Sequence, residues 1–148
     1  MKAGKVSEAV LKRSVIKAVN KQEKQHMVSK AAVGLDAGLF AEEEMTGVMA
    51  VSCTTLSGKE DGLAALAVNR ACNSLAATGA YPAAVTVQLM LAESTEEKDL
   101  KVIMNDVISA CNEAKVALVN GHTQVSSFVT EPVISVTAMG NAAATMTM

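Results

Sequence analysis

The chain has 148 residues, which suits a single domain with a real core, and half of its residues are apolar although only 2% are aromatic. The lack of aromatic rings argues against stacking surfaces for single-stranded nucleic acid, and no apolar run is long enough to span a bilayer. The net charge of −2 hides a division, because residues 1–30 carry eight basic against two acidic residues and the remainder carries five against thirteen.

Residues 1–30 are predicted to form a basic helix followed by a polar loop. Apolar residues in the segment 7–20 recur on one side of a helix, and Ser7 is a suitable N-cap. A basic arm of this kind is either a solvated helix or a patch for nucleic acid or membrane, and the solvated helix is the commoner case. We therefore expect neither nucleic acid nor a membrane as a partner.

The three cysteines, Cys53, Cys72 and Cys111, are odd in number and have no C-x-x-C spacing. This pattern indicates reduced thiols, without a disulfide framework or a zinc site. The N-terminal lysines are not followed by an apolar run of the kind found in secretory signals. We expect a cytoplasmic protein.

Residues 31–140 alternate between short apolar runs and two long helical patterns. The first long helix begins at Leu63 and ends at Gly79, three residues before Pro82, as Gly and Pro after a helix predict. The second begins at Ser94 or Thr95 and runs to about residue 114. Strands are expected at 31–40, 48–54, 83–92, 116–119 and 133–139. The tail, 141–148, has no packing pattern and is expected to be frayed or a cut point in a longer protein.

This order of elements predicts an α/β (α+β) fold: a mixed or antiparallel sheet of about five strands with two long helices on one face. The other face then has little to cover it, which favours a homodimer. A charge placed at whichever of Val87 and Leu89 faces the partner should disrupt that dimer.

A polar cluster is expected where three loops meet at one end of the sheet. The loops carry Asp36 in GLDAG, residues 52–55 after the second strand, and residues 120–123 after the fourth. Asn73 of the central helix is expected beside them, either as a ligand or as a merely exposed residue. His122 is either a structural loop residue or part of a site. The sequence contains neither a phosphate-binding P-loop nor G-x-G-x-x-G, and two distant histidines do not make a metal site.

Two stretches carry a resemblance to a known family. NRACNSLAATGAYP, followed by a strand and a helix, and then LVNGHTQVSSFVTEPVISVTAMG, resemble the N-terminal domain of the aminoimidazole ribonucleotide (AIR) synthetase superfamily. Hydrogenase maturation factor E, selenophosphate synthetase and thiamine-monophosphate kinase belong to the same superfamily. The resemblance runs from about Val33 to Gly140. It implies a barrel shared across a homodimer and ATP held through Mg²⁺ ions on aspartates.

Two of the residues that the resemblance assigns to the nucleotide site lack the negative charge of the family pattern. Asp36 matches one family aspartate and is a candidate metal ligand. Thr54 and Ser74 stand where the family has the aspartates of T-D and N-D. The remaining matches are Asn73, Gly121, His122 and Thr123, with Asn120 in place of a glycine. Because Mg²⁺ prefers carboxylate oxygens, these replacements predict a degenerate site.

Three functions follow from this resemblance. The first is a degenerate relative that keeps the fold and dimer surface and serves as a partner or regulatory subunit. The second is an ATP-dependent enzyme that transfers a phosphoryl group and needs Mg²⁺. The third is a fragment whose C-terminal domain, or a larger catalytic partner, does the specific work. The sequence favours the first and does not specify a substrate.

Overall fold

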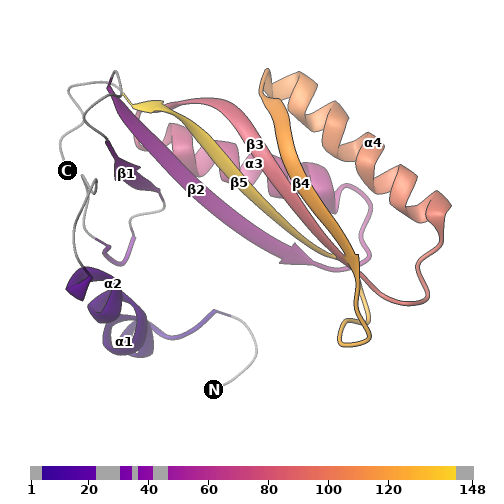
Figure 1. The fold of residues 1–148 in the computed structure, drawn as a ribbon, viewed down its shortest axis with the longest axis horizontal. Helices are drawn as coiled ribbons and strands as arrows, with labels where there is room; N and C mark the ends of the chain where they lie inside the picture. Colours follow the sequence, from indigo (N-terminus) through magenta and orange to yellow (C-terminus); the bar gives the residue numbers. More distant parts are fainter. Residues whose placement is uncertain (1–4, 23–30, 35–36, 42–46, 143–148) are drawn as a thin grey trace.

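The structure is a computed structural model that describes residues 5–22, 31–34, 37–41 and 47–142 (Figure 1). Its elements, in chain order, are α1 (Glu8–Leu11), the π-helical segment η1 (Lys12–Ile16), α2 (Lys17–Lys21), β1 (Gly38–Phe40), β2 (Val48–Ser57), α3 (Leu63–Ala76), β3 (Tyr81–Leu91), α4 (Glu97–Ala114), β4 (Ala117–Val125) and β5 (Val133–Ala142). After the N-terminal helix, the order of strands and helices is the one that the sequence predicts.

The five strands form one mixed sheet in the order β1-β2-β5-β3-β4. β3 and β4 are parallel and are joined by α4, whereas all other neighbours are antiparallel. The α3 and α4 helices lie together on one face of the sheet (Figure 1). The predicted fold class is confirmed.

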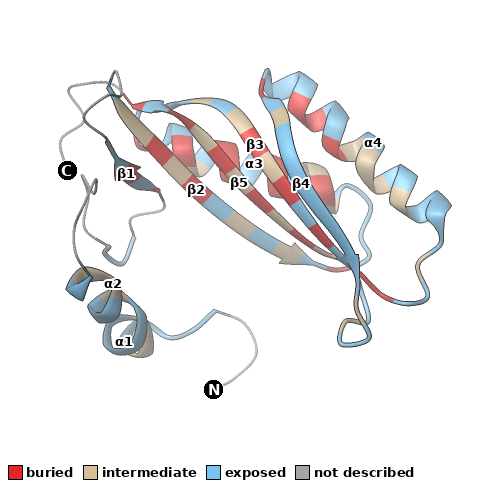
Figure 2. Ribbon diagram, viewed as in Figure 1, coloured by how far each residue is buried: buried red, intermediate tan, exposed pale blue. Residues whose placement is uncertain are grey.

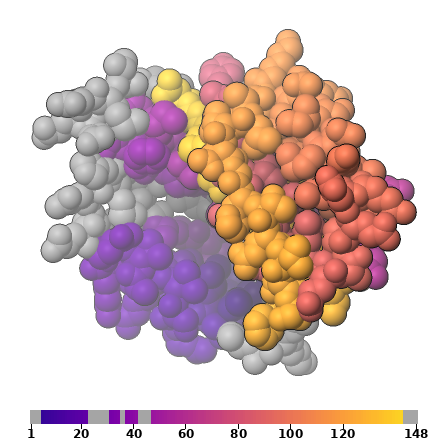
Figure 3. Space-filling model, turned by 45° about the vertical axis from the view of Figure 1, so that its right-hand side comes forward, coloured from indigo at the N-terminus to yellow at the C-terminus, as the bar shows by residue number. Residues whose placement is uncertain are grey.

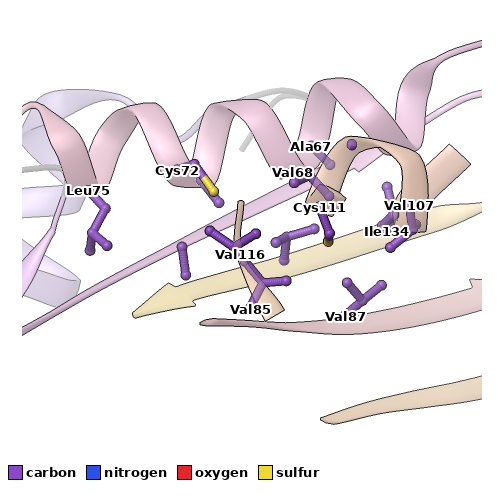
Figure 4. Close-up of a cluster of buried hydrophobic side chains, with 14 of the residues drawn as sticks. Ala67, Val68, Cys72, Leu75, Val85, Val87, Val107, Cys111, Val116 and Ile134 are labelled. Atoms are coloured by element: carbon purple, nitrogen blue, oxygen red, sulfur yellow. The ribbon is translucent and has the colours of Figure 1, made fainter. Parts of the chain in front are cut away.

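The core lies between this face and the two helices. Alternate residues of the central strands, among them Val85 and Val87 of β3 and Val136 of β5, are at most 4% exposed and meet α3 and α4 (Figures 2 and 4). Ala67 and Ala71 of α3 are fully buried, and such small side chains let a helix lie close to a sheet. Since Val87 and Leu89 both face the helices, neither lies on the uncovered face.

The opposite face of the sheet carries the other residues of the same strands. Register places Thr137 of β5 between Cys53 of β2 and Thr86 of β3, and it places Gln88 beside Ser135. These side chains are half-buried or exposed, and the Thr55 and Ser135 hydroxyls are 2.9 Å apart. We call this surface the open face, defined by Met49, Val51, Cys53, Thr55, Thr86, Gln88, Met90, Val133, Ser135, Thr137 and Met139.

Several element boundaries differ from the sequence prediction. The first strand covers only Gly38–Phe40 instead of 31–40, since Val33 and Gly34 form a turn. β2 continues to Ser57 because β-branched Thr54 and Thr55 extend its ten-residue ladder with β5. β4 runs to residue 125 instead of 119, and β5 reaches residue 142. The rest of the tail lies outside the described residues.

The N-terminal helix forms at residues 8–21, and Ser7 is its N-cap as predicted. It lies beside the strands, away from the face that α3 and α4 cover (Figures 1 and 3). Asn20 anchors its end through two hydrogen bonds, donating from Nδ2 to the Ala31 carbonyl and accepting from the Ala31 amide. Within the described ranges, no helix has the length and apolar character that crossing a membrane requires.

Candidate functional site

The predicted site residues of the N-G-H-T stretch lie within β4 and not in a loop after it. β4 is an edge strand that pairs with β3 only, residue 121 opposite Val87 and residue 122 opposite Gln88. His122 therefore extends on the open face, where its Nε2 lies 3.1 Å from Oε1 of Gln124. The prediction of a loop was wrong. Residues 120–123 are polar, which suggested a loop, but they continue β4 because β3 lies parallel to them and pairs with them.

Gly121 is required by the close approach of β4 to β3. A Cβ atom at this position would lie 2.8 Å from the carbonyl oxygen of Val87, closer than van der Waals contact allows. The register of the two strands also shifts between Val85 and Thr86, just before this point. Beside Gly121 is a pocket of about 360 Å³, bordered by residues 118–123 of β4 and by Met104 of α4.

Three other matched residues, Thr54, Asn73 and Ser74, lie on the helix side of the sheet. Thr54, in the middle of β2 instead of a following loop, is in register with fully buried Val136 and is half-buried. On α3, Ser74 is half-buried and Asn73 is exposed. Since buried Ala71 and Leu75 mark the face of α3 that packs on the sheet, Asn73 lies on the solvent side.

Within one chain, the predicted cluster does not form as a single site from the described residues. α3 covers one face of the sheet and the His122 side chain lies on the other, so the sheet separates Asn73 from His122. Asp36 lies outside the described residues. Among the residues that the structure does describe, no three His, Cys, Asp or Glu side chains are grouped so as to hold a metal ion.

A cavity of about 850 Å³ lies at a place that the sequence did not indicate. It opens where β2 and β3 end and α3 and α4 begin, between the loops at residues 58–62, 92–95 and 130–132. Leu89 and Ile134 of the sheet contribute its apolar floor, while carboxylates of the loop and of α4 line its rim. Crevices at the carboxyl ends of strands are common ligand sites in α/β proteins.

Asp106 of α4 links the two helices at this cavity. Gly62, at φ 80°, occupies the N-cap position of α3 and has no side chain to cap the helix. The Asp106 Oδ2 instead accepts a hydrogen bond of 3.1 Å from the amide of Ala65 in the first turn of α3. The sequence did contain a signal for this cap. Asp106 lies three residues after Ile103 and four before Ala110, so it is a carboxylate on the side of α4 that otherwise carries apolar residues.

Two cysteines lie between the same helices. Cys72 of α3 and Cys111 of α4 are both buried in the core (Figure 4). Burial raises the pKa of both thiols, and the neighbouring Cys111 raises the pKa of Cys72 further. Both thiols are therefore held in the neutral, unreactive form, whereas Cys53 is exposed on the open face.

This architecture and these motifs have known relatives. Residues 27–142 match the family model of the AIR synthase related protein, N-terminal domain, over most of the chain. The chain belongs to this family. The predicted resemblance is thereby confirmed.

Hydrogenase maturation proteins are among the individual relatives of this AIR synthase-related domain. A protein of Methanocaldococcus jannaschii assigned to hydrogenase expression and formation is 36% identical over 75 residues, covering 51% of this chain and 22% of the relative. In the crystal structure of a HypE–HypF complex, a similar chain is 26% identical, with a TM-score of 0.60, over 72% of this chain and 36% of that one.

A third relative shares the fold. HypE in complex with ATP is 19% identical, with a TM-score of 0.59, over 96% of this chain and 42% of that one. The AIR synthase-related domain described here thus spans well under half the length of each of these three relatives.

Proposed function

We infer that this domain is an assembly module of the AIR synthase type with a degenerate metal–nucleotide site, acting as a partner or regulatory subunit. The observation that carries this proposal is the chemistry at two positions on the helix side of the sheet. Thr54 and Ser74 present neutral hydroxyls where the family pattern has aspartates. A hydroxyl is a weaker ligand for Mg²⁺ than a carboxylate and does not offset its charge.

The loss of two negative charges at Thr54 and Ser74 should weaken the binding of ATP. Phosphoryl-transfer sites hold the β- and γ-phosphates through Mg²⁺ ions, and carboxylates fix those ions in place. With both aspartates replaced, Asp36 is the one carboxylate that remains from the pattern. We expect Mg²⁺ and ATP to bind weakly or not at all.

An ATP-dependent enzyme remains the second candidate, because a relative of the same fold is known in complex with ATP. This candidate rests on Asp36, Asn73 and the Gly121–Thr123 segment, which keep the family residue types. The nucleotide-site roles of all seven matched residues stay predictions.

The assembly part of the proposal rests on the difference between the two faces of the sheet. Side chains facing α3 and α4 are buried, whereas those on the open face, such as Val51, Thr137 and Met139, are half-buried in the single chain. If the same face of a second copy covers this face, apolar area is removed from water. Such a two-fold contact is closed, so no further copy can add to it. We expect a homodimer that joins the two open faces.

Calorimetric titration with ATP and Mg²⁺ tests the nucleotide part. The wild-type chain should show no low-micromolar binding, and Thr54→Asp with Ser74→Asp should strengthen any binding that exists. The matched control, Ser57→Asp with Ala76→Asp, places the same charges on the same two elements at other positions and should have no effect. Tight Mg²⁺-dependent binding by the wild type would instead support the enzyme.

Light scattering tests the assembly part. The wild-type chain should have the mass of a dimer at tens of micromolar. Thr137→Lys, which places a charge in the middle of the open face, should give monomer. Asn69→Lys, on the solvent side of α3, is the control and should leave the dimer intact. A stable wild-type monomer would remove this part of the proposal.

A further inference from the structure

The N-terminal helix has an apolar side with no place in the core. Leu11, Val15 and Val19 recur at four-residue spacing along it, yet none of residues 8–21 is buried and Val15 is 46% exposed. Apolar side chains at this spacing form a stripe that a stable helix normally buries against a partner. The same helix carries four basic residues against one acidic residue, Glu8.

The 850 Å³ cavity between α3 and α4 has the complementary character. Its floor includes Leu63, Leu89, Ile103 and Ile134, while its rim carries four carboxylates against the single cation Lys59. The carboxylates are Glu60, Asp61, Asp99 and Asp106. The cavity therefore combines an apolar surface with a net negative rim.

The Asp106 carboxylate at the N-terminus of α3 disfavours an anion as the occupant of the cavity. Free amides at a helix N-terminus attract phosphate or carboxylate groups. Here the Asp106 carboxylate already accepts from the Ala65 amide and adds its own negative charge. A cationic group attached to apolar side chains matches this site better than a phosphate does.

We propose that this cavity receives the N-terminal helix, residues 8–21, of a second copy of the chain. The stripe of Leu11, Val15 and Val19 meets the apolar floor, and Lys12, which flanks this stripe on the helix, meets the carboxylates of the cavity. The helix has no aromatic residue to anchor it in a bilayer interface, which favours a protein partner over a lipid surface. This contact is separate from the open face and goes beyond the proposed function.

Paramagnetic labelling of mixed samples tests the contact. A chain with Cys53→Ser and Ser14→Cys carries a nitroxide on the helix and no isotope, and it is mixed with a ¹⁵N-labelled Cys53→Ser chain. Amide signals of Asp61, Val102 and Ser109, which border the cavity, should broaden. Because label and isotope are on different chains, only contact between copies produces this effect.

Charge changes provide the matched comparison. Asp61→Lys in the isotope-labelled chain should weaken the contact about tenfold or more, which corresponds to about 1.4 kcal/mol. Glu113→Lys, the same kind of change at an exposed position that does not line the cavity, should leave it intact. Lys12→Glu in the spin-labelled chain should restore the broadening with Asp61→Lys. High salt should reduce the contact, because screening shortens the range of charge attraction.

Three results would overturn the proposal. In the first, signals broaden only when the label and the isotope are on the same chain. In the second, the broadened signals belong to residues away from the cavity. In the third, Asp61→Lys leaves the broadening unchanged. The two proposals fail separately. A chain that is dimeric by light scattering and loses its dimer with Thr137→Lys keeps the open-face assembly even if the cavity signals are unaffected.

Discussion

Removing the carboxylate of Asp106 tests how the two helices are joined. The Asp106→Ala substitution removes the acceptor of the Ala65 amide at the start of α3, where Gly62 supplies no side-chain cap. Loss of a helix cap costs about 1–2 kcal/mol, and loss of a negative charge near the positive end of the helix dipole adds about 0.5 kcal/mol. For a domain of this size, about 2 kcal/mol lowers Tm by about 4–8 °C.

Thermal and urea unfolding of three variants separate these contributions. Asp106→Asn keeps an oxygen acceptor and loses only the charge, so it should cost about 0.5 kcal/mol. Asn105→Ala, an exposed neighbour on the same helix, is the control and should change the unfolding free energy by less than about 0.5 kcal/mol. An Asp106→Ala chain as stable as the wild type would show that the cap does not stabilise α3.

Four further outcomes are expected from the described residues. Gly121→Ala should lower the unfolding free energy by about 1–3 kcal/mol in urea titrations, since its Cβ would press on the backbone carbonyl of Val87. A thiol reagent at neutral pH should modify Cys53 first, and the two buried thiols only as the chain unfolds. Their raised pKa values should also make stability fall above about pH 8.5, because the unfolded chain releases thiol protons that the folded chain retains. Asn73→Ala and His122→Ala should each change Tm little, because both side chains are exposed; a clear loss would assign them to the scaffold.

The order of the elements was predictable because the chain marks it locally. The stripe of small apolar residues in α3, the glycine at φ 86° after it and the alternation in β3 each depend on neighbours in sequence. The acidic start of α4 was also visible, although its N-cap is Glu96, in a capping box with Asp99, instead of Ser94 or Thr95. A glutamate at the N-cap is harder to recognise because Ser, Thr, Asp and Asn are the residues preferred there.

Strand ends were less predictable because partners decide them. Residues 52–57 and 120–125 are polar enough to suggest loops, yet each segment completes a ladder with a strand far away in the sequence. Pairing across the sheet also decides which face a residue occupies. Pairing with β3 places His122 on the open face, and pairing with β5 places Thr54 on the face that the helices cover. The residues next to Thr54 and His122 in the sequence do not predict these positions.

The separation of these residues links the nucleotide prediction to the dimer prediction. The resemblance assigns Thr54, Ser74 and His122 to one site, but within one chain the sheet lies between the first two and the third. A ligand that touches all three must therefore pass the edge of the sheet or contact residues of two copies. His122 lies on edge strand β4 and on the open face, the surface that we expect a second copy to cover. If the site is shared in this way, nucleotide binding and dimerisation are thermodynamically coupled, because each stabilises the state that the other requires. Any binding gained by Thr54→Asp with Ser74→Asp should then be lost when Thr137→Lys disrupts the dimer.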